Sequence, residues 1–147
     1  MTSVRQLGWL DANLFIHPLF EHDPHGPRCE EILRSLERGE AEAWVHAVTV
    51  HELTYALQKA RTDTIRHPRD VLQYLARVLA LRSVHIPDKE AVLEALHRWA
   101  TDGGRFADAL LLALARSSGL PVCTVNVHHF HGVRNTYIEP DPGRPLP

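Results

Sequence analysis

Short apolar segments alternate with longer segments of helical periodicity along most of the chain. The short segments have the length and residue types of buried strands. They lie at residues 7–10, 44–48, 83–87, 122–125 and 137–139. The longer segments repeat apolar residues every three or four positions, as helices do. They lie at residues 28–36, 50–57, 71–79, 91–99 and 106–115. This alternation predicts a three-layer α/β/α domain with a mostly parallel central sheet.

Glycine and proline mark the ends of these segments. Gly39 follows the first predicted helix, Gly103-Gly104 separates the last two, and Gly119-Leu120-Pro121 precedes a strand. The chain shows no internal repeat and no long linker. We therefore predict a single domain over residues 1–140, followed by a Pro/Gly-rich tail at 141–147.

Composition indicates an ordinary globular protein. The chain has 147 residues, 44% hydrophobic and 23% charged, which suits one domain with a real core. Its two cysteines, Cys29 and Cys123, lie within apolar patterns and favour a reducing, cytoplasmic setting. The N-terminus lacks the pattern of a secretory signal. The longest apolar run, residues 109–115, is far shorter than the roughly 20 residues of a membrane span, so we expect no membrane partner.

Charge is unevenly distributed. The formal net charge is −2, but the segment from Lys59 to Arg82 has six basic and two acidic residues, which gives +4 and leaves −6 for the rest. Such a basic segment suits a phosphate backbone. A solvated helix face and loop explain the same charges equally well.

Three acids stand out by their positions. Asp108 is the one charged residue in the run 106–115, and a carboxylate in so apolar a helix needs partners. Asp11 follows a predicted strand, and Glu52 lies early in a predicted helix. Asn126 also follows a strand. Parallel α/β sheets bind ligands beyond the carboxyl ends of their strands, and the predicted topology allows these four side chains to share that edge.

Carboxylates without a Cys/His ligand pattern suit a hard divalent ion such as Mg²⁺ or Mn²⁺. Such an ion activates water and neutralises charge on a phosphodiester. Each acid also has a structural alternative. Asp11 suits a turn, Glu52 suits a capping box opened by Thr49, and Asp108 favours the helix dipole.

Other chemistries have weaker support. Three of the 11 histidines are His128, His129 and His131, but no matching Cys/His set accompanies them, so we expect solvent-facing or hydrogen-bonding roles. The dipeptide His22-Asp23 lies in a Pro-flanked loop. The chain has no Gly-x-Ser-x-Gly, Walker-type or Gly-x-Gly-x-x-Gly motif.

Four segments resemble the ordered motifs of PIN-domain ribonucleases. The first two are Leu10-Asp11-Ala12-Asn13-Leu14-Phe15-Ile16 and Val48-Thr49-Val50-His51-Glu52-Leu53. The third begins Ala107-Asp108-Ala109-Leu110-Leu111, and the last is Thr124-Val125-Asn126-Val127-His128-His129-Phe130. The ordered set spans nearly the whole chain and is most similar to VapC-like toxins of bacterial toxin–antitoxin pairs.

The resemblance implies a metal-dependent endoribonuclease. It assigns Mg²⁺ or Mn²⁺ binding to Asp11, Glu52 and Asp108, and it places Asn126 where many members carry a fourth acid. His129 stands where the closing motif usually has an aspartate. Asn13 and Thr124 would support the site. The expected partners are an RNA substrate, a cognate antitoxin and a second copy in a homodimer.

The same resemblance assigns Lys59, Arg61 and Arg66 to RNA phosphates. A non-catalytic PIN-like module that binds RNA or a partner protein is the main alternative. A receiver-like signalling domain is disfavoured, because the only lysines are Lys59 and Lys89 and neither follows the last strands.

Overall fold

The computed structural model describes residues 3–60, 62–137 and 143. Its helices are α1 (Asn13–Ile16), α2 (Gly26–Glu37), α3 (Ala47–Ala60), α4 (Pro68–Leu79), α5 (Lys89–Asp102) and α6 (Phe106–Ser118), with 3-10 turns η1 (His17–Leu19) and η2 (Val127–His129). Its strands are β1 (Arg5–Trp9), β2 (Ala41–Trp44), β3 (Val84–His85), β4 (Val122–Thr124) and β5 (Asn135–Tyr137). Apart from Gly143, the predicted tail at 141–147 lies outside the described residues.

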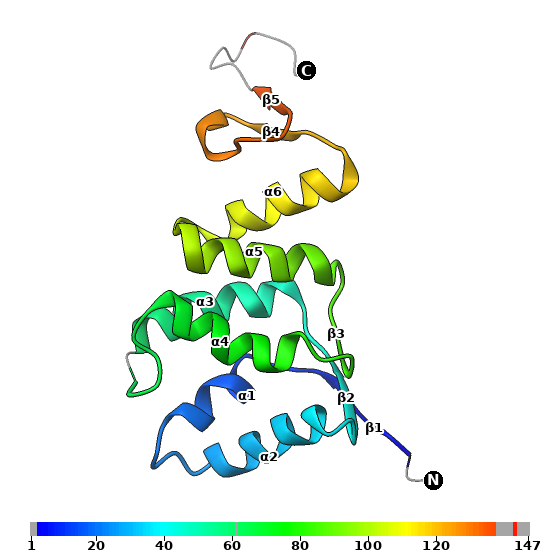
Figure 1. Ribbon diagram of the computed structural model, residues 1–147, viewed down its shortest axis with the longest axis vertical. Coiled ribbons are helices and arrows are strands. Elements are labelled where there is room, and N and C mark those ends of the chain that lie inside the picture. The colour runs from blue at the N-terminus through cyan, green and yellow to red at the C-terminus, as the bar shows by residue number, and fades with distance from the viewer. Residues whose placement is uncertain (1–2, 61, 138–142, 144–147) are drawn as a thin grey trace.

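The predicted α/β class with three layers and parallel strands is confirmed, but the described strands form two sheets. The first has the order β1-β2-β3 and the second pairs β4 with β5. Every strand pair is parallel. Figure 1 shows the two sheets toward opposite ends of the long axis, with α5 and α6 between them.

The core is divided in the same way. A large cluster includes Phe15 of α1, Leu33 of α2, Val50 of α3 and Phe106 of α6. A second cluster of buried residues lies under β4. It consists of Leu112, Ala115, Val122 and Phe130. Among the described residues, its members come from α6, from β4 and from the segment just after η2.

Two predictions around the start of α3 were wrong, and β5 begins two residues before the strand expected at 137–139. The strand expected at 44–48 is β2 at Ala41–Trp44, because alternate small residues, Ala41 and Ala43, are buried there. Helix α3 begins earlier than Thr49, and Nδ1 of His46 accepts the Val48 N–H (3.1 Å). The capping box predicted at Thr49 is therefore absent, which removes the structural explanation of Glu52.

Helix α6 is less enclosed than its apolar sequence predicts. Phe106, Ala109 and Leu112 are buried, but Leu111 keeps 48% of its surface exposed. One face of α6 is therefore open in this arrangement. Among the described residues, no helix is long and apolar enough to cross a membrane.

Tyr74 of α4 fixes the short helix α1. Its hydroxyl donates to the Phe15 carbonyl oxygen at 2.6 Å, and burial raises the pKa of this phenol well above its ordinary value. The phenol is therefore a neutral donor throughout the ordinary pH range. It positions the segment that begins at Asp11.

We predict that Tyr74→Phe lowers the free energy of unfolding by about 1 kcal/mol, because the partly buried carbonyl loses its donor. Urea unfolding followed by circular dichroism measures the change. Tyr55→Phe is the matched control, since Tyr55 is 63% exposed and its loss should cost less than about 0.5 kcal/mol. Equal effects of the two substitutions would contradict the anchoring role.

Helix α4 starts with the capping box that was expected on α3. The Asp70 carboxylate accepts the backbone N–H groups of Arg66 and His67, both at 2.9 Å. These two bonds lower the pKa of Asp70. A carboxyl group with a depressed pKa stabilises the folded state above its unfolded pKa of about 3.9, and the contribution disappears as pH falls through the folded value.

Asp70→Ala should therefore lower the urea midpoint at pH 6 and have progressively less effect as the pH falls below about 4. The measurement is a series of urea titrations from pH 6 to pH 3. Asp63→Ala, which removes an exposed acid of the preceding loop, serves as the control and should leave the midpoint nearly constant. A difference between wild type and Asp70→Ala that does not change with pH would refute this account.

Candidate functional site

Asp11 lies just beyond the carboxyl end of β1. The backbone continues the strand through Leu10, whose N–H donates to the Trp44 carbonyl at 2.8 Å. Asp11 is exposed, and its carboxylate accepts the backbone N–H of Asn13 at 3.4 Å. This contact places Asp11 at the start of α1 with its oxygens open to solvent. Asn13, the predicted supporting residue, is also exposed and begins α1.

Glu52 lies on the outer face of α3. Val50, Leu53 and Leu57 of the same helix are fully buried, which turns Glu52 toward solvent, where it is exposed. Its neighbour His51 contacts the ring of Phe106 in α6, with ring centroids 6.1 Å apart. The outer face of α3 therefore lies near the start of the helix that carries Asp108.

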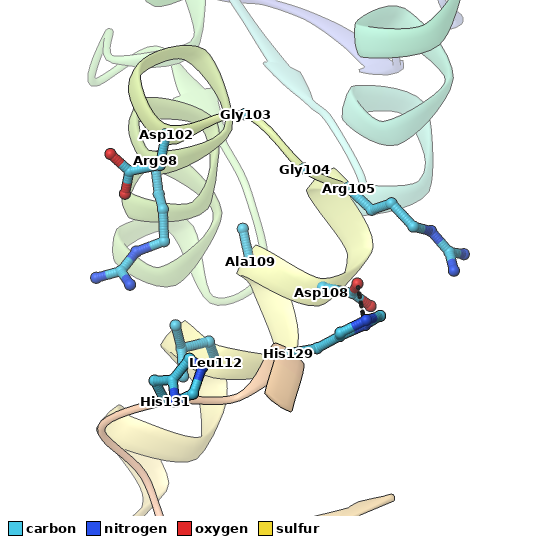
Figure 2. A pocket seen from close by; sticks show the side chains of 10 residues that line it. All are labelled: Arg98, Asp102, Gly103, Gly104, Arg105, Asp108, Ala109, Leu112, His129 and His131. Atoms are coloured by element: carbon cyan, nitrogen blue, oxygen red, sulfur yellow. Dashed lines mark ion pairs between the residues drawn. The ribbon is translucent and has the colours of Figure 1, made fainter. Parts of the chain in front are cut away.

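Asp108 is in the first turn of α6 and faces η2, in the loop between β4 and β5. Its side chain is 25% exposed, and Oδ2 lies 3.3 Å from Nδ1 of His129. Figure 2 shows the two side chains turned toward each other, His129 coming from η2. Asp108, which the sequence predicts to be buried, is therefore partly exposed, and its partner is the histidine that stands where the closing motif usually has an aspartate.

Asn126 and Thr124 belong to the same region. The backbone N–H of Asn126 donates to the Thr124 hydroxyl oxygen at 2.9 Å, and the N–H of His129 donates to the Asn126 carbonyl at 3.0 Å. The Asn126 side chain is exposed just beyond β4. Thr124 thus orders the loop that brings His129 to Asp108.

A pocket opens beside Asp108 and His129. Arg98, Asp102, Arg105 and His131 also line this pocket (Figure 2). Sequence reasoning did not single out Arg98, Arg105 or His131 as pocket residues. The Gly103-Gly104 break between α5 and α6 was the available signal, since it brings the ends of both helices to one pocket.

The predicted acids do not form a complete metal site in one chain. Among residues 3–60, 62–137 and 143, no three His, Cys, Asp or Glu side chains could together hold a metal ion. Asp11 contacts Asn13, and Asp108 contacts His129, whose backbone N–H donates to the Asn126 carbonyl. The carboxylate and amide oxygens of these residues are donor types that suit Mg²⁺ or Mn²⁺. Their roles as ligands stay predictions.

The predicted phosphate-binding residues have different settings. Lys59 Nζ lies 4.2 Å from the centroid of the Tyr55 ring and is exposed. Arg66 is exposed beside Thr62, Asp63 and His67 at a second pocket. Arg61 lies outside the described residues.

Arg77 belongs to the basic segment, but its charge is paired with acidic side chains of α2. It pairs with Glu37 and with Glu30, and these hydrogen bonds raise the pKa of its guanidinium. Its charge is thus neutralised locally, and the segment offers a phosphate less positive charge than the count of +4 indicates.

The loop with His22-Asp23 has a structural role. Asp23 bonds the His17 ring at 2.5 Å and accepts the His25 N–H at 2.8 Å. The bond to His17 is the main cause that lowers the pKa of Asp23. His22 itself is exposed. Asp23 therefore orders the turn before α2.

Comparison with known proteins gives one finding. A family profile described as the PIN domain matches residues 9–133. No curated protein matches the chain. The matched range begins within β1, ends after η2 and includes all four acidic or amide positions.

Proposed function

The chain belongs to the PIN-domain family, and from that premise we propose that it is a metal-dependent endoribonuclease that hydrolyses RNA phosphodiester bonds. PIN domains are generally nucleases. The observation that carries the proposal is the position of Asp11 and Asn126, each just beyond the carboxyl end of a parallel strand. Such positions are where α/β sheets bind their ligands.

The order of the motifs supports a more specific proposal for the role of this nuclease. Their similarity to VapC-like toxins supports a role as the toxin of a toxin–antitoxin pair, with a cognate antitoxin as partner. Exposed Lys59 and Arg66 supply positive charge for RNA phosphates. Mg²⁺ or Mn²⁺ is the proposed cofactor, because the predicted ligands are carboxylates.

A weakly active or inactive PIN-like module that binds RNA or a partner is the second candidate. Two observations favour it: among the described residues, no three His, Cys, Asp or Glu side chains could together hold a metal ion, and Asn126 and His129 stand where acids are expected. Binding of RNA without cleavage at any concentration of Mn²⁺ would support this candidate against the enzyme.

We predict that Asp11→Asn, Glu52→Gln and Asp108→Asn each lower the rate of Mn²⁺-dependent RNA cleavage by more than about 100-fold. Loss of a group that only orients a ligand costs roughly 10–100-fold, and loss of the ligand itself should cost more. The assay uses end-labelled structured RNA with Mn²⁺, Mg²⁺ or EDTA. Asp63→Asn, at another exposed acid, is the control. Full cleavage by Asp11→Asn and Asp108→Asn would sink the proposal.

His129→Asp should raise the affinity for Mn²⁺ by on the order of tenfold, because a carboxylate beside Asp108 adds a hard ligand and a negative charge. Isothermal titration measures the affinity. His128→Asp adds the same charge at the exposed neighbouring residue and should change it much less. Equal gains from both substitutions would show a general charge effect in place of ligation at Asp108.

A further inference from the structure

Two parallel sheets in this chain have edge strands that lie next to the predicted site. β1 lies at one edge of the first sheet, and β4 has only β5 as its neighbour. Parallel sheets are normally large and covered, and a pair of strands by itself is at best marginally stable in water. Among the described residues, the outer edges of β1 and β4 therefore lack a pairing strand.

Large apolar side chains are exposed beside both edges. Trp9, the last residue of β1, is 62% exposed, although its ring packs against Trp44 of β2 with centroids 5.4 Å apart. Leu120 and Val125, which flank β4 in sequence, are 66% and 59% exposed. Pairing of the β1 edge with a β4 edge would remove this apolar area from water.

The β4 edge cannot reach the β1 edge of its own chain in this arrangement. The first turn of α6 is fixed in the large core by Phe106, which is 2% exposed. Its last turn is held to α5 by the Arg116–Glu94 ion pair at 2.9 Å. Helix α6 runs across the long axis of the molecule, and the β4–β5 sheet lies on the side of α6 that faces away from the β1–β2–β3 sheet (Figure 1).

We propose that the β4 edge of a second copy adds to the β1 edge, and that two copies exchange these contacts reciprocally. A second copy carries both of the complementary edges. A two-fold symmetric pair therefore satisfies all four edges at once, whereas an unrelated strand would satisfy one. The described length of each strand is short, and the exposed Trp9, Leu120 and Val125 enlarge the contact.

The pairing completes the candidate site. Asp11 comes two residues after the end of β1, and Asn126 comes two residues after the end of β4. When parallel strands pair with their ends aligned, their carboxyl ends lie at one edge. Asp11 then lies beside Asn126 of the partner subunit. The Asp108–His129 contact brings Asp108 of the partner subunit with it. This role of the interface rests on the proposed function, but the strand pairing does not.

Thiol cross-linking tests the pairing without any activity. Cys123 of β4 is exposed, and burial raises the pKa of the other thiol, Cys29, which makes it less reactive. Gln6→Cys places a thiol on exposed β1, and Arg5→Cys is a second variant there in case the first fails to fold. A short bis-maleimide should join either new thiol to Cys123 and give a product of twice the chain mass.

Two controls locate the cross-link. Glu31→Cys, on exposed α2, should give no such product, and neither should Gln6→Cys combined with Cys123→Ser. A cross-link within one chain, recognised by a product of single mass, would overturn the proposal. So would the absence of any β1–β4 cross-link in both folded variants.

Complementation tests whether the interface builds the site. Asp11→Asn and Asp108→Asn chains with different tags are co-expressed and the mixed dimer is purified. In the proposed dimer, each site combines Asp11 of one copy with Asp108 of the other. One site of the mixed dimer then keeps both acids and the other site loses both, so about half of the wild-type cleavage rate should return. If each site instead takes both acids from a single chain, every site of the mixed dimer lacks one acid. The mixed dimer would then stay inactive, and this result would contradict the proposal.

The two experiments separate the two hypotheses. A cross-linked dimer in a protein that never cleaves RNA would refute the nuclease and leave the strand pairing intact. An active wild-type protein with no intermolecular cross-link and no complementation would refute the pairing and leave the nuclease intact.

Discussion

The attachment of α6 determines most of this structure. Phe106 fixes the first turn of α6 in the large core, and Glu94 of α5 holds its last turn through Arg116. Because a helix is stiff over this length, the attachment of α6 also positions β4 and β5, which follow it. The described strands therefore form two sheets, and the buried apolar side chains form two clusters.

The features that were predictable from sequence depend on local pattern. Helices α2, α4, α5 and α6 follow the three- and four-residue spacing of their apolar residues, and Gly103-Gly104 and Gly119 end two of them. Asp108 was singled out by contrast with its apolar neighbours, and the structure gives it a partner. These features can be predicted from a short segment of sequence, because the spacing of apolar residues within a helix indicates which face is buried.

The features that were not predictable depend on contacts between distant segments. The start of α3 is set by the His46 ring, which competes with the more familiar signal at Thr49. The pairing of Arg77 with Glu30 and Glu37 joins α4 to α2. The basic segment therefore presents less positive charge to a ligand than the number of its basic residues in the sequence indicates. Whether Asp11 meets Asp108 depends on the path of α6. No periodicity encodes that path, because it arises from packing among α3, α5 and α6.

The small cluster beneath β4 and β5 has a consequence for how the protein responds to its own abundance. Four buried side chains among the described residues give this unit little stability of its own. If two copies pair as proposed, their association also supplies free energy that orders this unit, and association follows mass action. The fraction of paired chains would then rise with chain concentration, so the proposed site would be complete only above a threshold concentration of the protein.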